Sequence, residues 1–137
     1  MDLQDAVVIV TGSSSGVGAA TARQLAERGA NVVINYARNE TGARDTQAAC
    51  EALGVETEVV QADVSDDSQC RRLADAAESR WGRIDGLVNN AGTTKFCAHD
   101  DLDGLDMDDF QTIYGVNTVG PYQMARAVVP AMRRGGQ

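Results

Sequence analysis

The most constraining feature of the chain is the segment Val7–Gly18, which reads VVIVTGSSSGVG. A short apolar run stops at Thr11, and glycines follow at positions 12, 16 and 18 before a helical pattern begins. Glycines in this turn let an anion approach the backbone, and the start of the helix offers it unpaired N–H groups and a positive dipole end. The segment predicts a strand, a phosphate-binding turn and a helix, although a simple flexible turn would also fit three glycines in seven residues.

Strand and helix patterns alternate along the rest of the chain. Strands are expected at 6–10, 32–35, 55–61 and 84–88, and helices at about 16–28, 41–53, 66–81 and 107–134. Ser65 is the expected N-cap of the third helix. The alternation predicts an α/β fold with a doubly wound parallel sheet of the Rossmann type, in which the strand order reverses once. Apolar and acidic residues alternate in the third strand, which indicates an edge position or one wet face.

Ligands of such sheets bind beyond the carboxyl ends of the strands, at the reversal of strand order. Each of the four expected strands is followed by a segment that could contact a ligand. These segments are the glycine turn, Tyr36–Arg38, Asp63-Val64 and Asn89–Gly92. Because they should all meet at one edge of the sheet, the sequence predicts a single nucleotide-binding crevice.

Composition excludes several classes of partner. The chain has 137 residues, enough for one domain, and a net charge of -8, which argues against nucleic acid and anionic membranes. Its start is acidic, without the basic region of a secretory signal, and no apolar run is long enough to span a membrane. Cys50, Cys70 and Cys97 fit neither a zinc site nor a disulfide framework, which indicates reduced thiols and a cytoplasmic protein.

No metal site is expected. Six aspartates crowd the stretch 100–109, but Gly104 has the wrong offset for a calcium-binding loop. We interpret this stretch as an acidic, solvated approach to the N-terminus of the last helix.

The motifs TGSSSGVG at 11–18 and NNAG at 89–92 resemble those of short-chain dehydrogenases/reductases. The stretch Asn35–Arg38 is most similar to the 3-oxoacyl-[acyl-carrier-protein] reductase branch. The resemblance implies that residues 1–137 are an NADP-binding Rossmann domain, the N-terminal portion of a longer enzyme, ending before strand five. It further implies an NADPH-dependent oxidoreductase that transfers hydride to a small ketone, in particular a 3-oxoacyl thioester.

Carried over residue by residue, the resemblance assigns the pyrophosphate to the glycine turn, the adenine to Asp63 and Val64, and the nicotinamide ribose to 90–92. Asn89 is expected to hold strands together through its side-chain amide. The expected cofactor-binding residues are Gly12, Ser14, Ser15, Gly16, Val17, Gly18, Tyr36, Arg38, Asp63, Val64, Asn90, Ala91 and Gly92.

The choice of cofactor depends on the end of the second strand. Family members that prefer NAD place an acid where this chain has Tyr36, and Arg38 could pair with a 2′-phosphate. NADP is therefore favoured over NAD. Two observations leave the choice open: Ser15 stands where NADP users have a basic residue, and Arg38 could equally be a solvated surface residue.

Asn117 is the only member of the family's Asn-Ser-Tyr-Lys tetrad in the chain, and it is the expected catalytic residue. Pro121, four residues later, lacks an N–H and could free the Asn117 carbonyl for a water of the proton relay; a plain proline kink is the alternative. None of the three tyrosines has a lysine four residues on. We therefore expect cofactor binding without catalysis, with a non-catalytic nucleotide-binding module or an interaction fragment as the alternatives.

The last helix carries a stripe of Met124, Val128 and Ala131, which fits either core packing or a subunit interface. The resemblance implies that this helix pairs with its copy in a homo-oligomer. The strand at 84–88 would form an apolar edge in a chain that ends before strand five.

Overall fold

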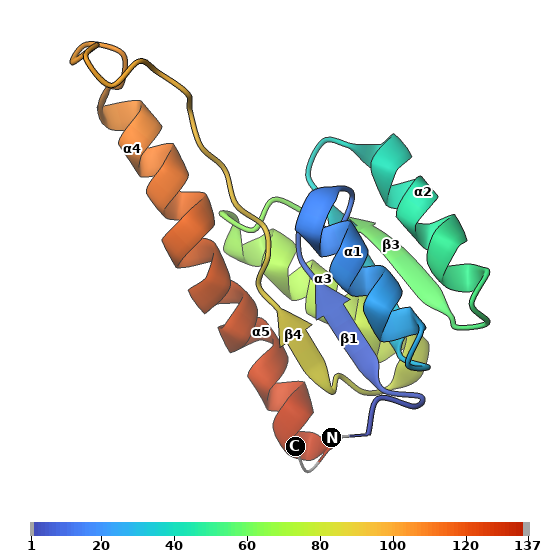
Figure 1. The fold of residues 1–137 in the computed structure, drawn as a ribbon. Coiled ribbons are helices and arrows are strands. Elements are labelled where there is room, and N and C mark those ends of the chain that lie inside the picture. The colour runs from blue at the N-terminus through green and yellow to red at the C-terminus, as the bar shows by residue number, and fades with distance from the viewer. Residues whose placement is uncertain (1, 136–137) are drawn as a thin grey trace.

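The structure, a computed structural model, describes residues 2–135, so the outermost positions of the expected 1–137 domain lie outside the described residues. One parallel sheet of four strands, in the order β3-β2-β1-β4, organises the chain (Figure 1). The strands are β1 (Val7–Val10), β2 (Asn31–Tyr36), β3 (Thr57–Gln61) and β4 (Gly86–Val88). The helical elements are α1 (Gly16–Ala26), α2 (Glu40–Glu51), α3 (Asp67–Trp81), α4 (Met107–Tyr114), the π-helical turn η1 (Gly115–Val119) and α5 (Gly120–Arg134).

The predicted Rossmann-type fold is confirmed. Consecutive strands β1, β2 and β3 lie side by side, and β4 returns to the other side of β1, which is the single expected reversal. β3 is an edge strand, which is one of the two explanations that its alternating pattern left open, and β4 forms the opposite edge of the four-stranded sheet.

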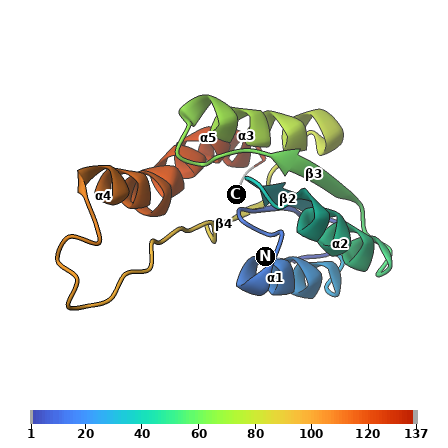
Figure 2. The same cartoon turned by 90° about the horizontal axis from the view of Figure 1, so that it is seen from above.

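Helices cover both faces of the sheet, α1 and α2 on one and α3 and α5 on the other (Figure 2). This explains why β1 is apolar throughout, since successive side chains of a strand point to opposite faces. Val8 and Val10 belong to the buried cluster of the α1/α2 face, and Val7 and Ile9 belong to the cluster of the α3/α5 face.

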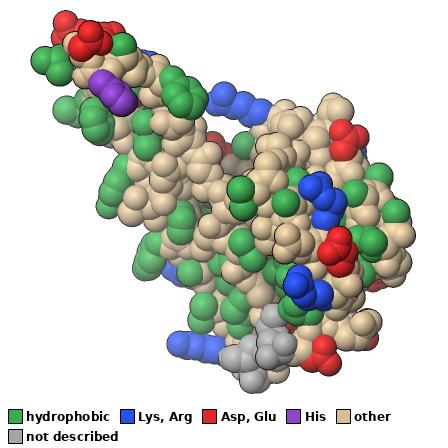
Figure 3. Space-filling model, in the orientation of Figure 1, with side chains coloured by type: hydrophobic (Ala, Val, Ile, Leu, Met, Phe, Trp, Pro, Cys, Tyr) green, Lys and Arg blue, Asp and Glu red, His purple; other side chains and the backbone are tan. Residues whose placement is uncertain are grey.

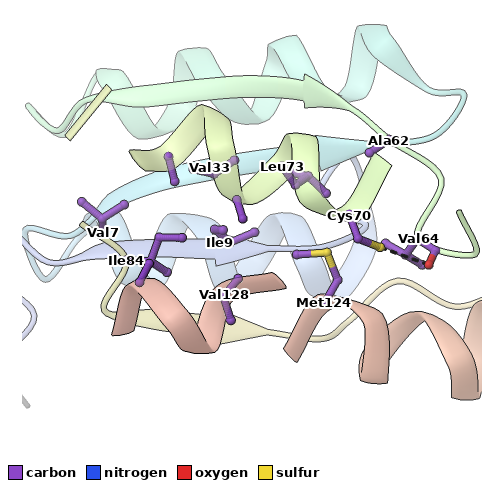
Figure 4. Close-up of a cluster of buried hydrophobic side chains, with 13 residues drawn as sticks. Val7, Ile9, Val33, Ala62, Val64, Cys70, Leu73, Ile84, Met124 and Val128 are labelled. Carbon is purple, nitrogen blue, oxygen red and sulfur yellow. Dashed lines mark hydrogen bonds between the residues drawn. The ribbon is translucent and has the colours of Figure 1, made fainter. Parts of the chain in front are cut away.

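The stripe of the last helix packs into the core. Met124 and Val128 are 0% and 1% exposed and lie against side chains of the sheet and α3, including Ile9 and Leu73 (Figure 4). Of the two alternatives that the sequence left open for this stripe, the structure shows core packing.

The N-cap of α3 is Asp66, and the expectation of Ser65 is wrong. The Asp66 carboxylate accepts hydrogen bonds from the backbone N–H groups of Ser68 and Gln69, at 2.8 and 3.3 Å. Ser65 instead directs both its N–H and its hydroxyl to the Asp63 carboxylate, at 2.9 and 2.7 Å. A carboxylate one residue later is the stronger acceptor and suits the positive end of the helix dipole.

The single helix expected at 107–134 is interrupted by η1. The N–H of Gly120 bonds to the carbonyl of Gly115, five residues back, so the turn holds one extra residue. Pro121 lies at the start of α5, directly after η1, and has no N–H with which to bond back to the preceding turn. Within residues 2–135, no helix has both the length and the hydropathy that a bilayer crossing requires.

Candidate functional site

A cleft of about 970 Å³ opens at the carboxyl ends of the strands, where the strand order reverses between β1 and β4. Eleven of the thirteen expected cofactor-binding residues line it: Gly12, Ser14, Ser15, Gly16, Val17, Arg38, Asp63, Val64, Asn90, Ala91 and Gly92. Its other lining residues are Asn35, Ala37, Asn39, Ser65, Thr93, Gln111, Thr112, Gly115 and Val116. The topology thus brings the four predicted segments to one place.

The glycine turn is pressed against the segment that follows β4. Gly12 has a φ of +62°, and a Cβ there would lie 2.8 Å from the backbone Cα of Ala91. A Cβ on Gly18, which lies beneath the cleft lining, would collide with the Gly12 carbonyl and the Asn90 amide. Around Gly16, in contrast, nothing lies within 4 Å of a Cβ position, so this part of the turn faces open space.

The N-terminus of α1 carries no cap. Ser15 occupies the N-cap position with an extended backbone, but its side chain makes no capping hydrogen bond, and the first turn contains no acidic residue. The first N–H groups of a helix have no partner within the helix. At the start of α1, Ser15, Gly16 and Val17 line the cleft, and an anion bound there would satisfy their N–H groups.

Asn90 ties the end of β4 to the glycine turn. Its side-chain amide donates to the carbonyls of Thr11 and Gly12, at 2.9 and 3.0 Å, and its own N–H donates to the Thr11 hydroxyl. The sequence interpretation gave this strand-joining role to Asn89, and that was wrong. Asn89 lies one residue earlier, is exposed, and donates to the Pro121 carbonyl of α5.

Asn117 lies in η1; it is exposed and is not among the residues that line the cleft. Its side chain accepts from the N–H of Thr93 at 2.8 Å and donates to the carbonyl of the same residue at 2.9 Å. This two-way pairing fastens the backbone that follows Gly92 to η1. No local sequence signal connected positions 93 and 117.

Tyr36 and Arg38, at the end of β2 and just after it, lie differently with respect to the cleft. Tyr36 lies outside the cleft; it is 8% exposed and packs in the cluster of the α1/α2 face. Arg38 is exposed at the rim of the cleft, and it forms no ion pair with any other residue of the 2–135 range.

Asp63 follows β3, which is separated by β2 from the strand that leads into the glycine turn. Hydrogen bonds from Ser65 hold one oxygen of its carboxylate, and its N–H donates to the Gln69 side chain at 2.9 Å. The backbone that carries Asp63 and Val64 is therefore anchored to the first turn of α3.

The acidic stretch before α4 has a structural use that the sequence predicted. Asp106 and Asp109 form a reciprocal capping box at the start of α4. Asp109 also pairs with Lys95 at 2.6 Å, which holds the loop against the helix. The hydrogen bond from Lys95 is the largest cause of a lowered pKa at Asp109.

Comparisons with known proteins agree with this geometry. The family model for short chain dehydrogenase matches residues 6–137. The chain is 42% identical over 95% of its length to a candidate ketoacyl reductase 2 of the granaticin polyketide synthase from Streptomyces violaceoruber, covering 51% of that protein. It is 40% identical over 93% of its length to 3beta-hydroxysteroid dehydrogenase 1 from Eggerthella lenta, covering 48% of it.

A solved structure of a candidate short-chain dehydrogenase/reductase from Burkholderia xenovorans superimposes with a TM-score of 0.91 at 42% identity. The superposition covers 95% of this chain and 53% of that one. The chain therefore spans about half the length of the relatives that it matches.

Proposed function

Because this chain belongs to the short-chain dehydrogenase family, we propose that it is the NADP-binding part of an oxidoreductase that reduces ketones. The observation that carries the proposal is the uncapped N-terminus of α1, which lies in the lining of a cleft at the strand reversal. Those N–H groups call for an anion, and the cleft has room for the rest of a dinucleotide.

The residues around the cleft suit the parts of NADPH. We assign the pyrophosphate to the turn from Gly12 to Gly18, the adenine to Asp63 and Val64, and the nicotinamide ribose to 90–92. When bound, NADPH supplies hydride to the substrate carbonyl carbon. The part of these residues is to hold the nucleotide.

We propose NADP rather than NAD because Arg38 stands at the rim with its guanidinium unpaired among the described residues. A charge-assisted contact to a 2′-phosphate contributes about 1.5–3 kcal/mol, which corresponds to about 10- to 150-fold in affinity. No carboxylate follows β2 at the positions that could hold both ribose hydroxyls, since Tyr36 is buried and Ala37 is apolar.

Calorimetric titration of the 137-residue chain with NADPH and NADH tests the proposal. We expect NADPH to bind more tightly than NADH. Arg38→Ala should lower the affinity for NADPH by at least tenfold and leave the affinity for NADH unchanged. Arg44→Ala is the matched control, because Arg44 is an exposed arginine of α2 paired with Glu40 and lies outside the cleft lining. Equal affinity for the two nucleotides would overturn the assignment of NADP.

For the whole enzyme we propose reduction of a 3-oxoacyl thioester or similar ketone, a substrate class that the printed name of the Streptomyces relative supports. Asn117 is proposed to serve the proton relay through its backbone carbonyl. The 137 residues contain no Tyr with a Lys four positions later, so we expect this chain to bind NADPH without oxidising it in the presence of an acetoacetyl thioester. Turnover by the purified chain would contradict this assignment of the general acid.

We further propose a homo-oligomer that forms through the last helical elements. Large apolar side chains are exposed along α4 and α5. In Figure 3, hydrophobic side chains gather on the projecting part of the molecule, which α4 and the loop before it form in Figure 1. Phe110, Tyr114 and Tyr122 are 65%, 62% and 64% exposed. Light scattering of the purified chain measures its mass in solution. We also propose a cytoplasmic location, which the three free thiols support.

A further inference from the structure

Asn35 is a polar side chain buried among apolar ones. It is the next-to-last residue of β2, follows the apolar run 32–34, and is 1% exposed. Burying a carboxamide without partners is costly, so its hydrogen bonds show what it does. The first lies 23 positions away in the sequence: the Asn35 side-chain oxygen accepts from the N–H of Gly12 at 2.9 Å.

The nitrogen of the same carboxamide faces carbonyl groups at the ends of β2 and β3. It donates to the carbonyl of Ala62 at 3.0 Å and to those of Tyr36 and Val60 at 3.3 Å. These partners leave one orientation for the amide, because carbonyls can only accept and the Gly12 N–H can only donate. One side chain therefore joins the glycine turn to the residue immediately before Asp63.

The backbone of Asn35 strengthens the link to the turn. Its N–H donates to the Ser13 hydroxyl and its carbonyl accepts from the Ser13 N–H, both at 2.9 Å. The Ser13 hydroxyl in turn donates to the Val10 carbonyl at 2.7 Å, so neither Ser13 nor the Gly12 N–H is available to a ligand. Their hydrogen bonds serve to place the turn.

We propose that Asn35 is a positioning residue that sets the spacing between the pyrophosphate-binding turn and the adenine-binding end of β3. The inference rests on the proposed function, since it concerns how the same cleft holds a dinucleotide. Two subsites at a fixed separation act on one ligand as a bivalent site, because occupation of one raises the effective concentration at the other. Loosening the link lowers the affinity for a ligand that spans both subsites more than the affinity for a ligand that occupies only one.

The test compares NADPH, which spans both subsites, with adenosine 2′-monophosphate, which carries the adenine end but no pyrophosphate. We expect Asn35→Ala to weaken NADPH by about tenfold or more, the equivalent of one lost hydrogen bond, and to change the affinity of the monophosphate by less than about threefold. Loss of stability alone lowers the folded fraction equally for both ligands and leaves their ratio unchanged. An unchanged ratio in the folded variant would therefore overturn the proposal.

Thr57→Val provides the matched control. Thr57 is also a buried polar residue of the sheet, at 2% exposure. It lies at the end of β3 away from the cleft, and its hydroxyl donates to Glu51 of α2. The control should lose stability and keep the affinities of both ligands. Failure of the wild-type chain to bind NADPH would instead reject the proposed function, and this inference with it.

A measurement on the wild-type chain covers the case in which Asn35→Ala does not fold. Hydrogen exchange of the Gly12 and Ser13 amides is followed by NMR, with and without saturating adenosine 2′-monophosphate. If Asn35 transmits order from the end of β3, both amides should exchange more slowly by about threefold or more, although neither contacts the monophosphate in our assignment. Unchanged exchange at both amides would overturn the proposal.

Discussion

The N-termini of α1 and α3 lie at the same edge of the sheet and are built in opposite ways. At α3, the Asp66 carboxylate accepts from two backbone N–H groups of the first turn, and the side chains of Ser68 and Gln69 bond to it as well. At α1, Ser15 occupies the N-cap position, but its side chain accepts no hydrogen bond from the backbone N–H groups of the first turn. The N-terminus of α3 is satisfied by side chains of the protein, whereas the N-terminus of α1 has no side-chain cap and, in our proposal, binds an anion.

Among α1–α4, which each begin after a loop or turn, α1 is the exception. Asn39 caps α2 and Asp106 caps α4, each by accepting a backbone N–H of the first turn. A side-chain cap contributes about 1 kcal/mol to stability, so α1 without one gives up stability at the place where we propose that the nucleotide binds. The comparison predicts that adding a cap to α1 raises stability and lowers nucleotide affinity, whereas removing the cap of α3 lowers stability and leaves the affinity unchanged.

The largest effect is expected from Ser15→Asp. The new carboxylate can cap α1 and interact favourably with its dipole, which should raise the free energy of unfolding by about 1 kcal/mol. The same charge opposes a pyrophosphate, so we expect the affinity for NADPH to fall by about a hundredfold. Urea unfolding and calorimetric titration measure the two quantities. Ser15→Ala should change neither by much, since the hydroxyl makes no capping bond.

A smaller loss of affinity, about tenfold, is expected from Gly12→Ala. The methyl group would sit 2.8 Å from the Ala91 backbone on a residue with a φ of +62°, so the turn must shift away from β4. Gly54→Ala is the matched control, because Gly54 has a φ of +89° but open space around its Cβ position. Both variants should lose about 1 kcal/mol or more of stability from the strained φ, and only Gly12→Ala should lose NADPH affinity. Equal affinities for NADPH would show that the contact with Ala91 does not shape the site.

The smallest effect is expected at α3. Asp66→Ala removes the cap and should lower the Tm by about 4 °C at neutral pH, with no change in NADPH affinity. Hydrogen bonds from Ser68 and then Gln69 hold the pKa of Asp66 below its usual value of 3.8. The stabilisation is therefore complete above that value and is lost as the pH falls through the folded-state pKa. Thermal unfolding at pH 6 and pH 3 should show a smaller difference between variant and wild type at pH 3.

Much of the cleft follows from local patterns. The apolar run before Thr11 predicts a buried strand, and the glycines at 12 and 16 permit the positive φ values that the turn adopts. The amphipathic stripe of α3 likewise identifies its buried face, from Cys70 to Ala77. Because parallel strands align their carboxyl ends, these local elements were sufficient to predict where the cleft would lie.

The hydrogen bonds that hold the cleft together could not be predicted in this way. Asn35, Asn90 and Asn117 are each a single carboxamide, and each is paired with a backbone 20 or more positions away. Which carbonyl or N–H an amide meets depends on strand register and on the direction of its side chain. That is why the sequence assigned the strand-joining role to Asn89 and assigned no role to Asn35.

The sequence by itself determined the alternation of strands and helices, the glycine turn after β1 and the family. Only the tertiary structure decided that Met124 packs in the core, that η1 interrupts the last helix, and that α1 alone among α1–α4 lacks a capping side chain. The physical reason is the range of the interactions. Backbone preference and hydrophobic periodicity act over a few residues, whereas burial and the pairing of polar groups are settled by segments that meet only when the chain is folded.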